Sequence, residues 1–153
     1  MLFRSQLRAK YPSYASFGAS RIEDAATVLE ARDFASSVAL DEGDGTFVLQ
    51  PLPAEAQFAP VYAALAADFD GDGHADLLLG GNFYGVTPVQ GRYDASYGLL
   101  LSGDGKGGFV PVDLAKSGVM IEGQVRHLAF VRGPHGGRFV VAARNDDRLQ
   151  ILR

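Results

Sequence analysis

Four aspartates with glycines between them form the part of this sequence whose residue types and spacing best suit chemistry. Asp68, Asp70, Asp72 and Asp76 lie within the segment DFDGDGHAD. Carboxylates this close together repel one another unless a cation lies among them, and oxygen ligands in a flexible loop are those that Ca²⁺ prefers. We therefore predict one structural calcium site, in which the backbone carbonyl of His74 completes the ligand set.

The start of this segment matches the loop of an EF-hand, which needs a bidentate glutamate at its twelfth position. Leu79 stands there, and the flanking residues are typical of strands rather than helices. Two alternatives to a structural metal are a metal-free, solvated acidic turn and a catalytic metal. The structural metal is favoured, because a fully ligated Ca²⁺ leaves no open position for a substrate.

The composition excludes several classes of protein. The net charge of −4 comes from 14 basic and 18 acidic residues, and the aspartate segment supplies four of the acids, so no basic surface for nucleic acid is expected. No apolar run of about 18 residues predicts a membrane span, and no signal peptide is predicted at the start of the chain. The absence of cysteine excludes disulfides and thiol chemistry.

The chain divides into two parts by the periodicity of its apolar residues. Residues 1–32 are predicted to be helical, because Ser20 and Glu23 form a capping box before an apolar helical face. From residue 33 on, glycine-rich turns separate short apolar runs, which predicts a mainly β structure. The predicted strands comprise residues 34–40, 47–52, 61–67, 77–79, 97–101, 109–114, 125–131, 138–143 and 148–152. His127, on one of these strands, is expected to be a core residue.

Two pairs of segments resemble each other at nearly the same spacing. The Gly-Asp-Gly turn at residues 43–45 recurs at residues 103–105, and an alignment of Asn82 with Asn145 matches the apolar strands around them. Repeats of about sixty residues with four strands each are typical of propeller blades.

The second copy of the aspartate segment has lost its carboxylates. In the ungapped alignment Asp68 falls on Val131 and Asp76 falls on Phe139, and no acid replaces the two aspartates between them. One metal site is therefore predicted, not two.

The pattern D-x-D-x-D-G-x-x-D, preceded by a small-residue strand and followed by a leucine-rich strand and Gly-Gly-Asn, resembles the FG-GAP/VCBS repeat. That repeat is also the blade unit of integrin alpha-subunit propellers. The resemblance covers residues 34–153, and residues 81–98 further resemble the C-terminal part of secreted bacterial VCBS-repeat proteins.

This resemblance implies a partial β-propeller of about two four-stranded antiparallel blades after the helical segment. Half a blade is expected at residues 33–54, a full blade with the calcium loop at 60–116, and a last blade at 124–153. It also implies Ca²⁺ between the first two strands of a blade, an extracellular or cell-surface location, and a role in adhesion or recognition.

Propellers close with about four to eight blades, whereas this chain supplies about two. The open strand edges that result are expected to pair with partners, because an unpaired edge invites another strand. The predicted partners are the remaining blades of a longer chain or other copies of this one.

We predict a non-enzymatic, calcium-stabilised module for assembly, adhesion or recognition of protein or glycan, with no catalytic residues. The resemblance places the candidate ligand-binding residues on the face opposite the calcium loop: Asn82, Tyr84, Arg92, Tyr93, Asp94 and Tyr97. Tyrosine and arginine favour recognition, although residues 91–98 packing back on the blade is an equally simple reading.

Two further functions stay open at this point. One is the accessory or catalytic part of a propeller-type polysaccharide lyase or hydrolase, to which Arg92, Asp94 and Glu122 are the plausible contributors. The other is a structural subunit of a filament or surface layer.

Overall fold

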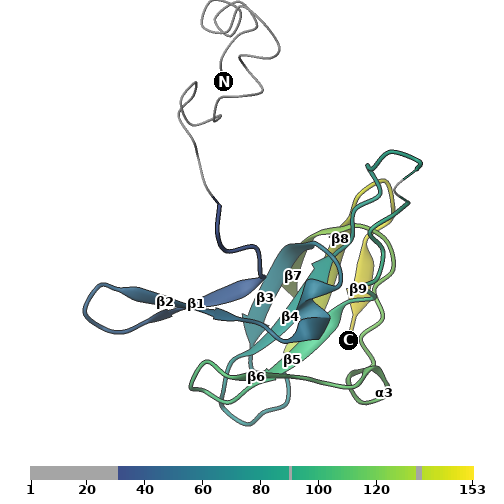
Figure 1. Ribbon diagram of the computed structural model, residues 1–153. Coiled ribbons are helices and arrows are strands. Elements are labelled where there is room, and N and C mark those ends of the chain that lie inside the picture. Colours follow the sequence, from purple (N-terminus) through teal and green to yellow (C-terminus); the bar gives the residue numbers. More distant parts are fainter. Residues whose placement is uncertain (1–30, 90, 134–135) are drawn as a thin grey trace, which may run out of the picture. The chain divides into compact units, whose positions relative to one another are not determined.

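The computed structural model describes residues 31–89, 91–133 and 136–153. By its internal contacts the chain divides into one unit up to Phe34 and a second, Ala35–Arg153, which contains all the strands described here (Figure 1). The helical segment predicted at residues 1–32 falls outside the described residues, apart from its last two.

The described residues form three antiparallel sheets. The first pairs β1 (Ser37–Asp41) with β2 (Phe47–Pro51). The second has the order β3 (Val61–Ala67), β4 (Asp76–Gly81), β5 (Leu99–Gly103), β6 (Phe109–Pro111). The third has the order β7 (Val125–Arg132), β8 (Arg138–Arg144), β9 (Gln150–Leu152). Two short helices connect them, η2 (Ala54–Gln57) and α3 (Leu114–Ser117).

The prediction of a mainly β chain with antiparallel sheets is confirmed. The sheets hold two, four and three strands, which are the numbers that the sequence predicts for each segment. No closed barrel or propeller is formed by the described residues, so the propeller architecture stays a prediction.

One predicted strand was too long. The strand expected at residues 109–114 ends at Pro111, and α3 begins at Leu114. The carboxylate of Asp113 accepts a hydrogen bond from the backbone N–H of Ala115 and so caps this helix, and Gly118, with φ 64°, ends it.

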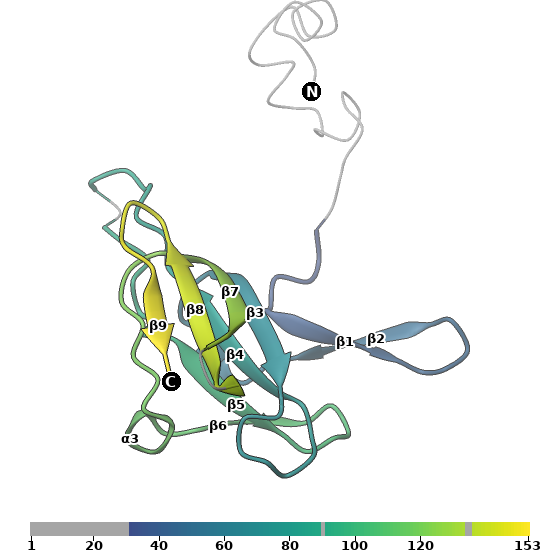
Figure 2. The same cartoon turned by 180° about the vertical axis from the view of Figure 1, so that it is seen from behind.

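Two clusters of buried apolar side chains hold the three sheets together. The first draws on the second and third sheets and contains Ala63, Leu78, Ile121, Val125, Leu128, Val140 and Ala142. The second contains Leu52, Ala56, Leu79 and Leu101, with Val38 of β1 packed against it. β4 contributes to both clusters because successive strand residues point to opposite faces. Figure 2 shows β7 lying alongside β3, where the first cluster forms.

The hairpins β3–β4 and β7–β8 share an irregularity that shows how the two repeats correspond. A shift in register follows Val61 in β3 and Val125 in β7. Val61 pairs with Gly81, and Val125 pairs with Arg144. Equivalent residues are therefore 64 positions apart before the turn and 63 apart after it, so the second turn is one residue shorter.

This shorter turn corrects the ungapped alignment of the two repeats. Asp68 corresponds to Arg132 rather than to Val131, whereas Asp76 still corresponds to Phe139. The prediction that the second turn lacks the carboxylates of the first is unaffected, since residues 132–138 contain none.

The bulge also decides which side chains of β7 face the core. Val125 and Leu128 are both buried, although strict alternation would place them on opposite faces. His127 is exposed. The prediction of a core histidine was wrong, because the sequence pattern does not reveal the extra residue in the strand.

Candidate metal centre

The aspartate segment forms the turn between β3 and β4. Ala67 and Asp76 are the last paired residues of the two strands, so residues 68–75 make the turn itself. Carboxylate oxygens of Asp68, Asp70 and Asp76 all lie within 4.8 Å of one another. We call residues 68–76 the metal loop.

Backbone hydrogen bonds to Asp68 hold the metal loop in its bend. Its Oδ1 accepts from the N–H of Gly71 at 2.6 Å, and its Oδ2 accepts from the N–H of Gly73 at 3.0 Å. Both glycines have positive φ, 85° and 89°, which residues with a Cβ rarely adopt. The two glycines thus let the chain bend so that both oxygens of one carboxylate accept backbone hydrogen bonds from the same loop.

Asp72 and His74 stand outside the group of three carboxylates. Oδ1 of Asp72 accepts from the backbone N–H of His74 at 2.7 Å, while the N–H of Asp72 donates to Asp70 at 3.1 Å. The ring of His74 lies beside Gly105, where its Nδ1 is 2.3 Å from the position that a Cβ would take. Of the four predicted carboxylate ligands, the structure brings Asp68, Asp70 and Asp76 together, and the carbonyl of His74 stays a predicted ligand.

Asp76 is the buried member of the group, with 1% of its surface exposed. Its Oδ2 accepts from the N–H of Phe69 at 2.8 Å, and its Oδ1 accepts from the N–H of Gly103 at 2.9 Å. A Cβ at Gly103 would lie 2.1 Å from the carbonyl oxygen of Ala75, so the chains approach closely here. Asp76 therefore joins the metal loop to the end of β5.

The chemistry of these side chains suits a hard divalent cation. Within the described residues, none of the three carboxylates forms an ion pair with a basic side chain. A cation among the three would relieve their mutual repulsion, and oxygen atoms are the ligands that Ca²⁺ takes. The group fits such an ion, and nothing in its geometry singles out Ca²⁺ from other hard cations.

Two other aspartates, Asp44 and Asp104, lie at the tips of hairpins and accept hydrogen bonds within those turns. A hydrogen bond from the hydroxyl of Thr46 lowers the pKa of Asp44, and its backbone N–H adds to the effect. The backbone N–H groups of Lys106 and Gly108 likewise lower the pKa of Asp104. Asp44 and Asp104 are equivalent in the repeat, and both stabilise the turn in which they lie.

The candidate ligand-binding residues divide into two sets. Asn82 is 2% exposed, and its side chain donates to the carbonyls of Ser96 and Gly123 and accepts from the N–H of Ser96. This side chain joins the loop after β4 to the segment before β7. Tyr93 lies in the same loop but pairs with Phe83 through its backbone, and about half of its surface is exposed.

Four of the six candidates line one surface hollow of ≈ 400 Å³, which we call the acidic hollow. Its lining residues are Asn82, Tyr84, Asp94, Ser96, Tyr97, Glu122, Gly123 and Asp147. Arg92 does not line it; its guanidinium lies over the ring of Tyr84, 4.7 Å from the centroid. Sequence reasoning missed Asp147, because its turn approaches the hollow only through the pairing of distant strands.

Comparisons with family models, with curated proteins and with solved structures found no match to this chain. Among the helices described, none has the length and apolar character needed to cross a membrane.

Proposed function

We propose that this chain is a non-enzymatic, calcium-stabilised β-repeat module of the FG-GAP/VCBS kind. It acts outside the cell or at its surface in assembly, adhesion or the recognition of protein or glycan. The observation that supports this best is the convergence of Asp68, Asp70 and Asp76 in the turn between two paired strands.

A bound ion in the metal loop would act on the fold rather than on a substrate. Both oxygens of Asp76 already accept backbone hydrogen bonds, one from within the loop and one from β5. An ion held by Asp76 together with Asp68 and Asp70 would fasten the β3–β4 turn to the neighbouring hairpin. Removing the ion should therefore lower stability without removing an activity.

Thermal and chemical unfolding with EDTA and with added Ca²⁺ test the proposal. Calcium at 100 times its dissociation constant should stabilise the folded chain by about 2.7 kcal/mol. Mg²⁺ at the same concentration should have a smaller effect, since it requires a tighter octahedral site. If Ca²⁺ leaves the unfolding transition unchanged, the calcium site is refuted.

A pair of matched variants sharpens this test. Asp70→Asn should abolish the calcium effect and leave the chain at least as stable in EDTA, because one of three repelling charges is gone. Asp94→Asn removes the same charge from the acidic hollow and should keep the full calcium effect. Equal loss in both variants would mean that Ca²⁺ acts on the overall charge and not at the loop.

Assembly is supported by the strand edges. All five residues of β2 are exposed, including Phe47, Val48 and Leu49. At the other end of the chain β9 is the last strand of its sheet, and Ile151 is 66% exposed. Unpaired apolar edges of this kind favour the addition of a strand, from another copy or from the remaining blades of a longer chain.

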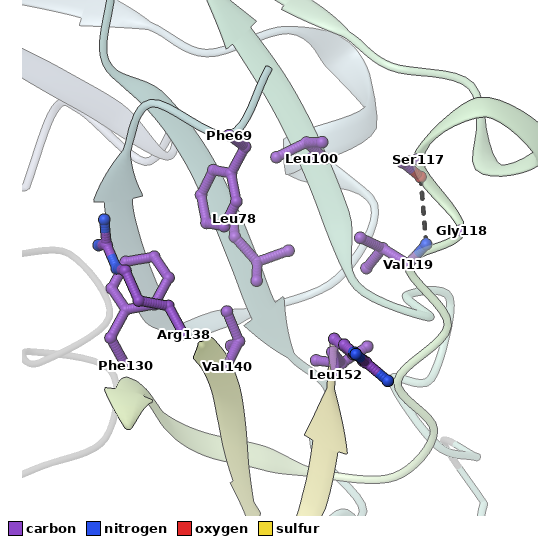
Figure 3. Close-up of a pocket in the computed structure, with 11 residues that line it drawn as sticks. Phe69, Leu78, Leu100, Ser117, Gly118, Val119, Phe130, Arg138, Val140 and Leu152 are labelled. Carbon is purple, nitrogen blue, oxygen red and sulfur yellow. Dashed lines mark hydrogen bonds between the residues drawn. The ribbon is translucent and has the colours of Figure 1, made fainter. Parts of the chain in front are cut away.

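A hollow of ≈ 450 Å³ lies beside β9, and its lining is mostly apolar but includes Arg138 and Arg153. Figure 3 shows its walls, to which Phe69, Leu78 and Leu100 contribute from one side and Phe130, Val140 and Leu152 from the other. Such a hollow at an open edge gives apolar residues of an added strand a place to pack.

Light scattering over a range of concentrations tests self-assembly. We expect association that grows with concentration and that Leu49→Lys decreases, because a charge on an edge strand opposes pairing. A monomer at every concentration would contradict pairing between copies and favour pairing with the strands of a longer chain.

A further inference from the structure

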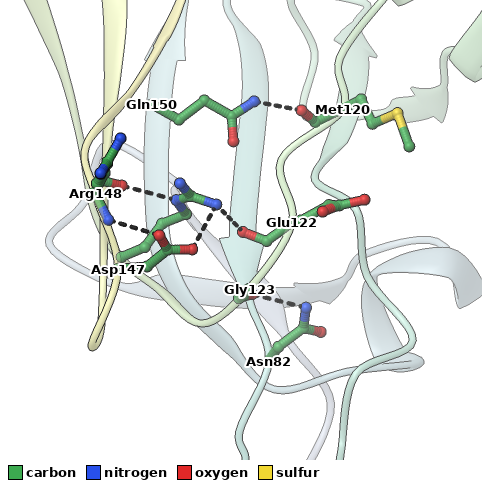
Figure 4. Close-up of polar contacts among 8 residues, drawn as sticks. Asn82, Met120, Glu122, Gly123, Asp147, Arg148 and Gln150 are labelled. Carbon is green, nitrogen blue, oxygen red and sulfur yellow. Dashed lines mark hydrogen bonds and ion pairs between the residues drawn. The ribbon is translucent and has the colours of Figure 1, made fainter.

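β9 is held firmly on one side and open on the other. It pairs with β8, and the side chain of Gln150 donates to the carbonyl of Met120 at 2.6 Å. Figure 4 shows this bond together with Arg144, which forms an ion pair with Asp147 and donates to the carbonyl of Arg148 in the turn before β9. Among the described residues, no backbone hydrogen bond joins β9 to a segment other than β8. The open edge is therefore fixed in place before any partner arrives, which lowers the cost of binding.

The second sheet shows how such an edge is covered. Its strand β4 is equivalent to β8, with Leu77 in the place of Val140. Leu77 pairs with Leu101 of β5, as Val140 pairs with Leu152 of β9. Leu152 therefore has the place of Leu101, which pairs on its other side with Pro111 of β6. Within the described residues, the third sheet has no counterpart of β6.

A counterpart of β6 exists elsewhere in the chain, as β2. In each hairpin the last pair joins residues six apart, Asp41 with Phe47 and Gly103 with Phe109. Both second strands begin with Phe-Val, so Leu49, the third residue of β2, corresponds to the third residue of β6. Phe109 packs against a buried cluster, whereas Phe47 is 64% exposed. β2 is thus a strand of the missing kind whose apolar side chains have no cover.

The two surfaces also carry opposite charges. Residues 37–51 contain three acids and no basic residue: Asp41, Glu42 and Asp44. The hollow beside β9 is lined by Arg138 and Arg153 and by no acid. The guanidinium of Arg138 lies over the ring of Phe130 (Figure 3) and forms no ion pair within the part of the chain that is described. The metal loop contributes Phe69 to the hollow, and its carboxylates are those that a bound cation would balance. An acidic, apolar hairpin is therefore complementary to this edge.

The two surfaces lie too far apart to meet within one chain. Figures 1 and 2 show the β1–β2 hairpin and β9 at opposite sides of the three sheets. A second copy of the chain offers the same hairpin without this restriction. Because the two surfaces differ, each copy can give its hairpin to one neighbour and receive the hairpin of another.

We infer that β2 of one copy adds to the open edge of β9 in the next copy, antiparallel to it, as β6 adds to β5. This inference rests on the self-assembly proposed above and names its two surfaces. By the equivalence with β6, Leu49 lies opposite Leu152 and Gln50 lies opposite Ile151. Phe47 and Leu49 then share a face with Leu152 and enter the hollow that it lines.

This register also brings the opposite charges together. Phe47 of the added strand falls level with Arg138, since each lies two residues beyond the pairs formed by Leu152. The acidic turn of the hairpin begins directly beyond Phe47.

Disulfide cross-linking tests the register, because the chain has no cysteine of its own. Gln50→Cys and Ile151→Cys both change exposed residues. Opposite residues of an antiparallel pair have Cα atoms about 4.5–5.5 Å apart, which a disulfide can span. An equimolar mixture of the two variants, oxidised in the presence of Ca²⁺, should form a mixed dimer, identified by intact-mass spectrometry.

Two further variants serve as controls for cross-linking to Ile151→Cys. Glu55→Cys changes an exposed residue outside both surfaces and should give about tenfold less mixed dimer, since pairing does not bring its thiol close. Val48→Cys lies on the same face of β2 as Gln50 but two residues along, at about 7–8 Å from the opposing residue, and should also give less.

Sedimentation velocity tests the contribution of charge. Glu42→Gln should weaken association by about twofold to fivefold, and added salt should weaken the association of the wild type. Glu55→Gln makes the same change at an exposed residue outside both surfaces and should leave association unchanged.

Two results would overturn the inference while leaving self-assembly intact. One is a wild type that associates although Gln50→Cys and Ile151→Cys give no more mixed dimer than the Glu55→Cys control. The other is Gln50→Cys cross-linking to itself as readily as to Ile151→Cys, which would mean that two β2 strands pair with each other. A wild type that is monomeric at every concentration would overturn both the inference and self-assembly. Failure of the calcium site is distinct, because it appears as a missing calcium effect in unfolding.

Discussion

The hairpins β3–β4 and β7–β8 have the same framework and different turns. Each has a register shift near the start of its first strand, after Val61 and after Val125. Each also places side chains in the same buried cluster, such as Leu78 and Val140. The turn of the first hairpin carries three converging carboxylates, whereas the turn of the second carries none.

The residue at the end of each turn shows how the two differ. Asp76 accepts hydrogen bonds from two backbone N–H groups, while the ring of its equivalent, Phe139, lies beside Gly133, 2.0 Å from where a Cβ of that residue would be. The same strand framework thus accepts a hydrogen-bonded carboxylate in one hairpin and an aromatic side chain in the other. The comparison teaches that strand packing sets the shared framework, whereas the carboxylates that could hold a metal lie in one turn and in the first residue of the strand after it.

Leu78→Ala should have the largest effect, because Leu78 lies in the cluster that both hairpins share and is 2% exposed. We expect a loss of about 2–5 kcal/mol in the free energy of unfolding, measured by denaturant titration. Val110→Ala, at a residue that is 68% exposed on β6, is the control and should change stability by less than about 0.5 kcal/mol. Similar losses in both variants would contradict a common core.

Asp76→Ala should have the next largest effect on stability, and it should disrupt only the β3–β4 turn. It leaves the N–H groups of Phe69 and Gly103 without their acceptor, which costs about 1–3 kcal/mol for a buried group. The loss should appear in EDTA as well as in Ca²⁺, in contrast to Asp70→Asn. If the variant matches the wild type in EDTA, Asp76 serves the metal and not the turn.

The smallest effect concerns the hairpin tips, where Asp44 and Asp104 are the second pair of equivalent residues. Hydrogen bonds lower the pKa of both, chiefly from the hydroxyl of Thr46 and from the N–H of Lys106. A carboxyl whose pKa is lower in the folded chain adds stability above its unfolded pKa of about 3.9, and this is lost as pH falls through the folded pKa.

Acid unfolding of Asp44→Asn and Asp104→Asn measures this effect. The wild type should lose more stability than either variant as pH falls below about 4. The difference should be small for both, since both carboxyls are fully exposed and water screens them. A wild type whose stability falls no faster than that of the variants would show that the two turns do not depend on charge.

Much of the fold could be predicted from the sequence. The mainly β class and the positions of the strands follow from short apolar runs with glycine-rich turns between them, which are local signals. The bulges and the shorter second turn could not be predicted, because an extra residue in one strand shows only when the partner strand is paired with it.

The metal loop could also be predicted from the sequence. The spacing of Asp68, Asp70, Asp72 and Asp76 by itself predicted that carboxylates would gather at this turn, which holds for three of the four. Only the tertiary structure decided that Asp76 is buried and bonded to Gly103, and that Asp94, Glu122 and Asp147 meet around one hollow. Spacing along the chain determines what lies within one turn, whereas contacts between distant segments depend on how the sheets pair and pack.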